Sequence, residues 1–311
     1  MNILVTGGAG YIGSKLVSTL LNLGHKVIVV DNLMYRQTSL AHLISHSSLE
    51  FHHGDVRDFH LMGKLIGSAD AIFPLAAIVG APACSKDPIL AKSINNEAVK
   101  WMFERVSDSQ ILIMPTTNSA YGQGEEGNYC DENSPLNPLS LYAKDKVEVE
   151  QALMEKGNVT SLRLATVFGV SPRMRLDLLV NNFVFRAATD GFIVIFEGHF
   201  KRNYIHINDV VQAFILALEN RTRFSGEIFN VGLSEANISK LDLCKKIKEV
   251  VASEFIFFEA EVGKDPDQRN YIVSNKKIES AGFTPSVSLE DGIKELYKGM
   301  PLFSQKLHAN Y

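Results

Sequence analysis

The most constraining feature of this 311-residue sequence is a run of three regularly spaced glycines close to its first residue. Gly7, Gly10 and Gly13 follow an apolar segment over residues 3–5 and precede a helical pattern over residues 11–23. In such a strand–turn–helix unit, Gly7 permits a tight turn, Gly10 lets the backbone approach a pyrophosphate, and Gly13 lets the helix pack closely on the strand. The helix amides then face the phosphate charge. We therefore predict a dinucleotide-binding site.

An acidic residue closes this unit. Asp31 follows a second apolar segment, residues 26–30. A carboxylate there can accept hydrogen bonds from both hydroxyls of an adenosine ribose and would repel a 2'-phosphate. We therefore predict NAD, and not NADP, as the cofactor. Two alternatives stay open: Asp31 could simply cap the following helix, and Arg36 is close enough in sequence to meet a 2'-phosphate.

The first half of the chain alternates short apolar segments with longer helical patterns. Further strand-like segments follow at residues 49–53, 69–74, 110–115 and 159–164. Strands that are apolar on both faces are typical of a parallel sheet covered by helices on both sides. The predicted fold class is therefore α/β, with a Rossmann-type, doubly wound parallel sheet.

The pattern loosens from about residue 166, with longer loops and short strands. We predict an NAD-binding Rossmann domain over residues 1–165. A smaller, discontinuous α/β substrate lobe is expected mainly over residues 166–311. Segments near residues 203–220 and 228–232 are expected to return to the Rossmann domain.

Composition excludes several functional classes. Thirty-one Lys and Arg against thirty-five Asp and Glu give a net charge of −4, the wrong sign for a protein whose main partner is nucleic acid. No apolar run of about 18 residues suggests a membrane span, so we expect a cytoplasmic protein without a membrane partner. Three scattered cysteines and the His42/His46 pair lack the spacing and companion ligands of a metal centre. We expect no metal.

Three residues in the middle of the chain suggest a reaction. Tyr142 and Lys146 are four apart and share one helix face, and Thr117 precedes them. Without other motifs, a Tyr and a Lys at this spacing usually lie together on the solvent-exposed face of a helix and have no catalytic role. Beside a dinucleotide site it predicts hydride transfer: Lys146 would lower the phenol pKa from about 10, Tyr142 would exchange a proton with an alcohol, and Thr117 would hydrogen-bond the same oxygen. The dinucleotide would accept the hydride.

These residues resemble the extended short-chain dehydrogenase/reductase family, in particular its NAD-dependent nucleotide-sugar epimerases and dehydratases. The resemblance covers nearly the whole chain. Residues 54–58 are similar to the family loop in which the first Asp, here Asp55, bonds the adenine. Residues 74–77 resemble its H-x-A-A motif with Pro74 in place of His, and Asn95 falls at its structural Asn.

Three later segments extend the resemblance. Residues 163–169 are similar to R-x-x-N-V-Y-G, with Thr166 in place of Asn, and residues 202–209 and 229–232 match C-terminal family segments. The resemblance implies a set of residues that contact NAD. They are Gly7, Gly10, Tyr11, Ile12, Gly13, Asp31, Asn32, Asp55, Val56, Leu75, Ala76, Ala77, Asn95, Tyr142 and Lys146.

The resemblance also implies a nucleotide-sugar substrate. Arg202 and Arg269 fall where the family places cations for the substrate diphosphate, and Asn182 resembles an amide that touches it. Arg173 and Arg175 are further candidates, because Arg forks match phosphate oxygens. These two could equally be solvated loop charges. The family usually forms homodimers through a helix bundle, here residues 89–106 and 141–155.

The residues after Thr117 narrow the reaction. Family members that dehydrate sugars carry acidic residues there, whereas this chain has Asn118 and Ser119, which do not titrate near neutral pH. We assign both to substrate binding and disfavour dehydration.

Residues 75–84 and 163–181 are more particularly similar to GDP-heptose 4-dehydrogenases of surface-polysaccharide pathways. We therefore predict NAD-dependent oxidation of the 4-hydroxyl of a nucleotide-activated sugar, with GDP-heptose favoured. The alternatives are a 4-epimerase acting on a UDP- or GDP-hexose and, less favoured, a dehydratase or a non-catalytic NAD-binding sensor.

Overall fold

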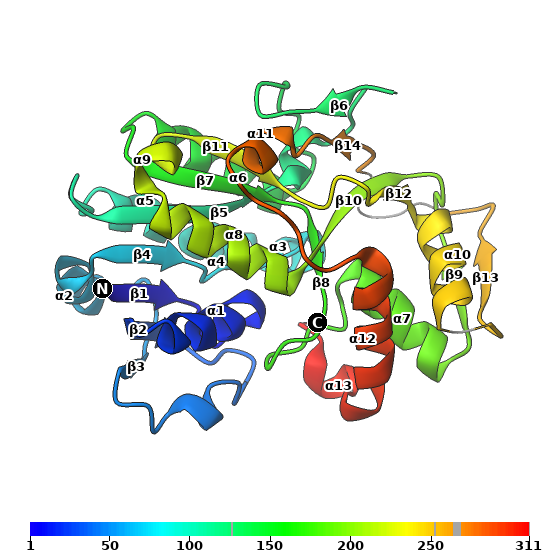
Figure 1. Cartoon of the computed structure of the whole chain (residues 1–311), viewed down its shortest axis with the longest axis horizontal. Coiled ribbons are helices and arrows are strands. Elements are labelled where there is room, and N and C mark those ends of the chain that lie inside the picture. The colour runs from blue at the N-terminus through cyan, green and yellow to red at the C-terminus, as the bar shows by residue number, and fades with distance from the viewer. Residues whose placement is uncertain (126, 252, 264–268, 311) are drawn as a thin grey trace.

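A seven-stranded parallel sheet forms the centre of the larger lobe in the computed structural model (Figure 1), which describes residues 1–125, 127–251, 253–263 and 269–310. The strand order is β11-β7-β5-β4-β1-β2-β3. The strands are β1 (Asn2–Thr6), β2 (Lys26–Asp31), β3 (Leu49–His53), β4 (Ala71–Pro74), β5 (Ile111–Thr117), β7 (Val159–Leu164) and β11 (Ile228–Val231). This arrangement confirms the predicted Rossmann-type α/β fold.

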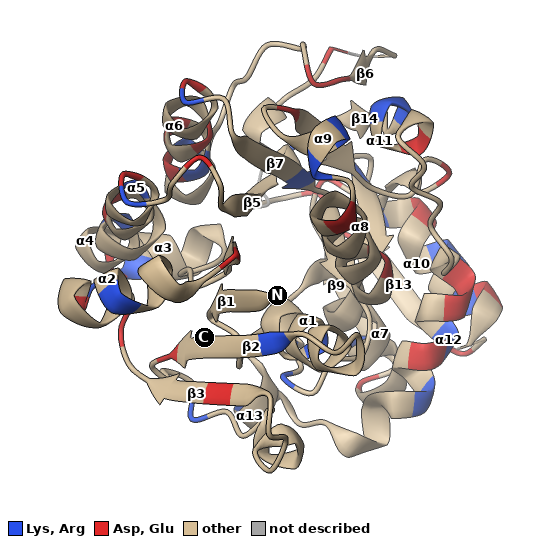
Figure 2. Ribbon diagram, turned by 60° about the vertical axis from the view of Figure 1, so that its left-hand side comes forward, with Lys and Arg blue, Asp and Glu red and all other residues tan. Residues whose placement is uncertain are grey.

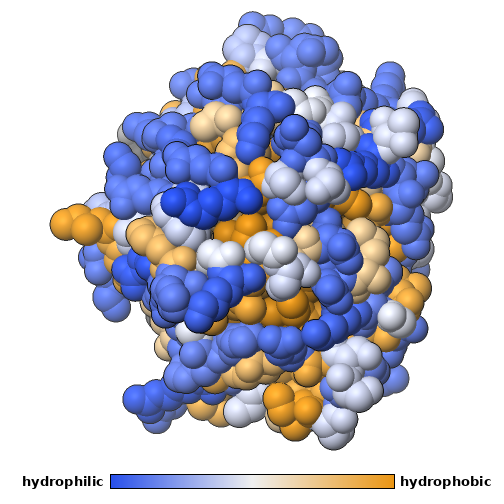
Figure 3. Space-filling model, turned by 90° about the vertical axis from the view of Figure 1, so that its left-hand side faces the viewer, coloured by the Kyte–Doolittle hydropathy of each residue, from blue (hydrophilic) through white to orange (hydrophobic). Residues whose placement is uncertain are grey.

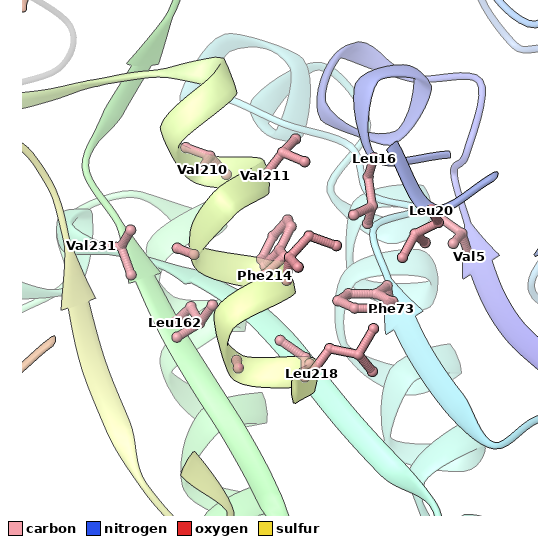
Figure 4. Close-up of a cluster of buried hydrophobic side chains, with 14 of the residues drawn as sticks. Val5, Leu16, Leu20, Phe73, Leu162, Val210, Val211, Phe214, Leu218 and Val231 are labelled. Carbon is pink, nitrogen blue, oxygen red and sulfur yellow. The ribbon is translucent and has the colours of Figure 1, made fainter. Parts of the chain in front are cut away.

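Helices cover both faces of this sheet. One face carries α1 (Tyr11–Asn22) and α8 (Ile207–Glu219), and the other carries α2 (Phe59–Ser68), α5 (Ala98–Phe103) and α6 (Leu141–Met154). Alternate strand residues supply the two cores, since Ile3 and Val5 pack toward the first pair of helices and Leu4 packs toward the second group. Figure 4 shows Phe214 of α8 in the first core, where its ring lies 5.6 Å from that of Phe73.

Between these helices and strands lie short elements. They are η1 (Ala41–Leu43), α3 (Ala81–Lys86), α4 (Pro88–Lys92), the π-helical η2 (Ser93–Glu97), η3 (Asn118–Tyr121) and α9 (Arg221–Phe224).

The smaller lobe has its own core and short sheets. A three-stranded sheet joins β12 (Asn237–Ser239), β10 (Lys201–His206) and β8 (Thr166–Phe168). Two-stranded sheets pair β13 (Ile256–Glu259) with β9 (Phe192–Ile195), and β14 (Ile272–Val273) with β6 (Tyr129–Cys130). The helices are α7 (Leu179–Thr189), α10 (Lys240–Val250), α11 (Lys276–Ser280), α12 (Leu289–Gly299), η4 (Met300–Leu302) and α13 (Gln305–His308).

The chain passes between the lobes more than once. After β10 in the smaller lobe, α8 packs on the large sheet and β11 becomes its edge strand beside β7. The domain boundary near residue 165 stays a prediction.

Charge is concentrated outside the large sheet. Figure 2 shows few charged residues on its strands and many on the surrounding helices. The face in Figure 3 is mostly hydrophilic, with apolar residues in small groups. Within the described ranges, no helix has both the length and the apolar character needed to cross a membrane.

Candidate active site

The glycine motif forms the turn between β1 and α1. Gly7 has a φ of 66°, and a Cβ on it would lie 2.6 Å from the backbone nitrogen of Ala76. A Cβ on Gly13 would lie 2.3 Å from the carbonyl oxygen of Gly7. No side chain caps the N-terminus of α1 at Gly10. The first main-chain amides of the helix can therefore face a ligand.

A pocket that is partly open to solvent lies beside this turn. The glycine turn, the end of β2 and the segments after β3 and β4 form its walls. The lining residues are Gly7, Gly10, Val30, Asp31, Asn32, Met34, Tyr35, Gln37, Gly54, Asp55, Val56, Leu75, Ala76, Ala77, Ile78 and Ile94. Nine of the residues predicted to bind the cofactor are in this set.

Asp31 is buried at the end of β2 and is held by the glycine turn. Its carboxylate accepts hydrogen bonds from the amides of Ala9 and Leu33, both at 2.9 Å, and from Nε2 of Gln37 at 3.1 Å. Burial raises its pKa, while the amide hydrogen bonds act in the opposite direction. Its bond to Leu33 closes a turn, and η1 begins only at Ala41, so Asp31 does not cap a helix. Arg36 is exposed.

Asp55 is a second acceptor in the pocket wall. Its carboxylate pairs with the Arg57 guanidinium at 2.8 Å and accepts a hydrogen bond from Nδ2 of Asn32 at 3.3 Å. The bonds from Arg57 lower the pKa of Asp55 to about 2. It is therefore ionised at neutral pH and suited to an amino group such as that of adenine.

Asn95 supports the pocket from behind. Its side chain accepts a hydrogen bond from the Ile78 amide at 2.8 Å and donates one to the Ile78 carbonyl at 2.9 Å. Ile78 lines the pocket, so Asn95 fixes the wall without facing the cavity. Cys84 packs against the same carbonyl, and burial raises its thiol pKa to about 11. A protonated, packed thiol is a poor nucleophile.

Two of the predicted catalytic residues, Lys146 and Thr117, lie at the end of β5, and the third, Tyr142, lies one turn before Lys146 on α6. Tyr142 and Lys146 lie on α6, which begins after the cap made by Ser140. Lys146 is 3% exposed, and its Nζ donates a hydrogen bond to the Pro115 carbonyl at 3.4 Å, two residues before Thr117. The Thr117 hydroxyl donates to Oγ of Ser119 at 2.8 Å.

Tyr142 connects this group to the cofactor pocket. Its ring packs against a cluster that contains Val56 and Ile78, and both of these residues line the pocket. A ligand that extends along the pocket therefore approaches the phenol.

Burial dominates the pKa values of the two titratable groups. It raises the pKa of Tyr142 to about 12 and lowers that of Lys146 to about 8. The positive charges of Arg175 and Arg269 act on Tyr142 in the opposite direction but are outweighed. The predicted net lowering of the Tyr142 pKa is therefore wrong for the polypeptide by itself, because desolvation of the phenolate outweighs the effect of nearby positive charges.

Sequence reasoning missed a buried ion pair that supports α6. Glu150 accepts hydrogen bonds from Arg163 Nη2 at 2.7 Å, from Thr116 at 2.8 Å and from Ser161 at 2.5 Å. These partners lie on β5 and β7, so the carboxylate joins the helix to both strands. The sequence indicated the position of Glu150 but not its partners, since Glu150 continues the four-residue spacing of Tyr142 and Lys146 along one helix face.

The residues predicted to bind substrate lie in several places. Asn118 is fully buried, and neither polar atom of its amide has a hydrogen-bond partner in the described part of the chain. Arg269 donates a hydrogen bond to Ser119, next to Thr117. Arg202 is buried over the Tyr271 ring. Asn182 donates to the Leu176 carbonyl at 3.1 Å.

Arg173 and Arg175 are both buried, so their interpretation as solvated loop charges is wrong. Arg175 pairs with Asp177. The Arg173 guanidinium lies 5.2 Å from the centre of the Tyr35 ring, in the wall of the cofactor pocket.

Known families and proteins are similar to this chain over most of its length. The sequence profile of the "NAD dependent epimerase/dehydratase family" matches residues 3–232. The low-salt glycan biosynthesis protein Agl12 of Haloferax volcanii is 29% identical, over 94% of this chain and 96% of that protein. The CDP-paratose 2-epimerase of Salmonella typhi is 27% identical, over 96% and 98%.

Solved structures of similar proteins have the same fold over nearly the whole of this chain. The UDP-glucose 4-epimerase of Thermotoga maritima with UDP-glucose has a TM-score of 0.85 at 28% identity, over 97% of this chain and 100% of that one. The dTDP-glucose 4,6-dehydratase of Streptomyces venezuelae, solved with NAD, has a TM-score of 0.84 at 25% identity, over 99% and 100%.

Proposed function

Because this chain belongs to the NAD-dependent epimerase/dehydratase family, we propose that it oxidises the 4-hydroxyl of a nucleotide-activated sugar to a ketone. The observation that carries the proposal is the placement of three residues. Tyr142 and Lys146 share one face of α6, and Lys146 is tied to the strand that ends at Thr117. This arrangement supports roles as an acid–base group for Tyr142, a cation for Lys146 and a hydrogen-bonding hydroxyl for Thr117.

The pocket fits NAD, the cofactor of this enzyme family. A Cβ at Gly7 or Gly13 would collide with backbone atoms. Because both residues are glycines, the turn can pack tightly and its backbone can approach the phosphates of a dinucleotide. The ionised Asp55 suits the adenine amino group, and the buried Asp31 suits ribose hydroxyls. When bound, NAD would supply the hydride acceptor, and a positive charge added to the site would favour ionisation of the Tyr142 phenol.

The side chains then perform the proton chemistry. The Tyr142 phenolate takes the proton of the sugar hydroxyl as the carbon–hydrogen bond gives up its hydride and the carbon–oxygen double bond forms. The Thr117 hydroxyl orients that oxygen through a hydrogen bond. Lys146, charged below its pKa of about 8, stabilises the phenolate.

The substrate we favour is GDP-heptose, which would place the enzyme in surface-polysaccharide sugar biosynthesis. This choice rests on the similarity of residues 75–84 and 163–181 to GDP-heptose 4-dehydrogenases. We assign Arg202, Arg269 and Asn182 to the diphosphate side.

We assign Asn118 and Ser119 to the sugar. The buried amide of Asn118 supports this assignment, because a polar group without a partner is costly unless a ligand satisfies it.

The second candidate is a nucleotide-sugar 4-epimerase. It shares the oxidation step but must let the ketone turn and recover the hydride on its other face. The likeness to UDP-glucose 4-epimerase structures favours it. A dehydratase or a non-catalytic NAD sensor is less favoured, since Asn118 and Ser119 cannot supply acid–base catalysis and both Tyr142 and Lys146 are present.

Product analysis separates these functions. The purified protein is incubated with NAD in excess and with GDP-heptose, GDP-mannose or UDP-glucose in deuterated water, and the sugar is followed by NMR. We expect a 4-keto sugar from GDP-heptose and none with Tyr142→Phe. A clean inverted alcohol would assign the protein to the epimerases. A 6-deoxy-4-keto product carrying solvent deuterium would refute the exclusion of dehydration.

We also propose a cytoplasmic homodimer formed through residues 89–106 and 141–155. Two large apolar side chains in these segments support an interface, since Ile89 is 85% exposed and Leu141 is 43% exposed. Light scattering measures the mass directly, and Ile89→Asp should shift it toward the monomer. A monomeric wild-type protein would contradict the proposal.

A further inference from the structure

Two buried arginines lie on the segment that follows β8, residues 169–177, which we call the arginine segment. Arg173 is 5% exposed and Arg175 is 7% exposed. Arg175 pairs with Asp177. Among the described residues, Arg173 donates hydrogen bonds to two neutral oxygens, the Met174 carbonyl and Oδ1 of Asn310, the latter at 2.8 Å. Asp177 and Asp31 attract its positive charge from a distance, but no carboxylate that the structure describes forms an ion pair with Arg173.

Hydrogen bonds fix the arginine segment to the first residue of α1. The Tyr11 hydroxyl donates to the Gly169 carbonyl at 2.7 Å, and the Ser171 hydroxyl donates to the Tyr11 carbonyl at 2.6 Å. Nδ2 of Asn181 bridges the Tyr11 hydroxyl at 3.2 Å and the Arg175 carbonyl at 2.9 Å. The segment therefore lies at the helix end where the glycine turn meets a dinucleotide phosphate.

Arg173 also contacts the wall of the cofactor pocket. Its guanidinium lies 5.2 Å from the centre of the Tyr35 ring, and Tyr35 lines the pocket together with Asp31. Burial lowers the pKa of Arg173, and the neighbouring charge of Arg175 adds to this effect. An anion in the pocket would relieve both costs.

The last residues of the chain support Arg173 from the other side. Besides the bond from Arg173 to Asn310, the Leu176 amide donates to the His308 carbonyl at 2.7 Å. The His308 ring packs edge-on against Phe303, 5.3 Å away. Figure 1 shows α13, which ends at His308, at the junction of the two lobes. The C-terminal residues thus form a clasp on the arginine segment.

We propose that Arg173 binds the diphosphate of NAD and not that of the sugar nucleotide, with His308 and Asn310 holding the segment in place. The cofactor then binds to both lobes, through the first amides of α1 in the larger lobe and the Arg173 guanidinium in the smaller one. Its release requires the clasp to open. The assignment needs NAD binding only, so it does not depend on which sugar is oxidised.

The test compares release of NADH with binding of GDP. Holoenzyme reduced with substrate or dithionite is chased with excess NAD, and the loss of bound NADH fluorescence gives the release rate. We expect Arg173→Gln to release NADH about tenfold faster or more, as for loss of a charge-assisted hydrogen bond. The dissociation constant of GDP, measured by calorimetry, should stay unchanged.

Matched variants keep the test decisive. Arg36→Gln removes a nearby exposed arginine and should leave NADH release unchanged. Asn310→Ala leaves the buried charge in place, so it remains informative if Arg173→Gln fails to fold, and it should release NADH several-fold faster.

Three results would overturn the proposal. Weaker GDP binding with unchanged NADH release would return Arg173 to the substrate. An unchanged rate of NADH release in both Arg173→Gln and Asn310→Ala would show that neither Arg173 nor the C-terminal residues hold the cofactor. If Arg36→Gln accelerated NADH release as much as Arg173→Gln, the effect would come from the loss of any nearby positive charge and not from a contact made by Arg173.

Discussion

Lys146→Met replaces a buried charge by an apolar side chain of similar length. Lys146 is 3% exposed on α6, and burial lowers its pKa from 10.5 to about 8. In the unfolded chain this lysine keeps its proton up to its ordinary pKa. Between about pH 8 and 10.5 the unfolded state therefore binds more protons than the folded state, and wild-type stability rises with pH through that window.

The expected magnitude follows from the same shift. At about 1.36 kcal/mol per pKa unit, the buried charge costs the folded state about 3 kcal/mol at pH 7 and about 1.4 kcal/mol at pH 9.5. The variant avoids this cost but loses the hydrogen bond to the Pro115 carbonyl, worth about 1 kcal/mol. Lys146→Met should therefore be more stable than wild type by about 2 kcal/mol at pH 7 and nearly equal at pH 9.5.

Urea denaturation of the protein stripped of NAD measures this difference at both pH values. The same variant should lose at least about 100-fold in turnover, because the charge that stabilises the phenolate is gone. A variant that is more stable and inactive would identify Lys146 as a residue kept for function at a cost in stability. A variant that is less stable at pH 7, or whose gain does not shrink at pH 9.5, would refute the reasoning.

Three further variants test other parts of the site. Tyr142→Phe should retain NAD binding, measured by calorimetry, and lose at least about 100-fold in turnover, while near wild-type turnover would exclude its acid–base role. Wild type should bind NADH more tightly than NADPH because Asp31 faces the ribose, and Asp31→Ala should narrow the difference in a fluorescence titration; equal wild-type affinities would mean that Asp31 does not read the ribose. Glu150→Gln leaves the Arg163 charge buried without its partner and should lower the free energy of unfolding by about 3 to 5 kcal/mol, and a change below about 1 kcal/mol in urea denaturation would contradict that estimate.

Local patterns carried most of the fold prediction. The glycine motif and Asp31 lie within one strand–helix–strand unit, so their spacing alone defines the geometry of the turn. The strands β1, β2 and β4 at the centre of the large sheet are apolar on both faces, and that property is visible in sequence without knowledge of their order. The pair Tyr142 and Lys146 was equally accessible, because four-residue spacing fixes a shared helix face.

The rest of the site depends on contacts between distant segments. Arg163 lies on β7, and nothing in its local sequence indicates that Glu150 of α6 is its partner. Arg173 donates a hydrogen bond to Asn310, 137 residues further along the chain. The shift in the Tyr142 pKa likewise depends on how much protein surrounds the phenol, which spacing does not reveal.

The clasp on the cofactor bears on the choice between oxidation and epimerisation. Both reactions use Tyr142 in the same way and leave the hydride on the cofactor, so the proton chemistry does not distinguish them. What separates them is whether the ketone leaves before the hydride returns. If Arg173 and the C-terminal residues slow the release of NADH, the enzyme stays reduced after each oxidation until NADH dissociates or the hydride returns to the bound ketone. While NADH stays bound, this protein acts as a dehydrogenase only if the ketone leaves the site faster than it rotates and recovers the hydride on its other face.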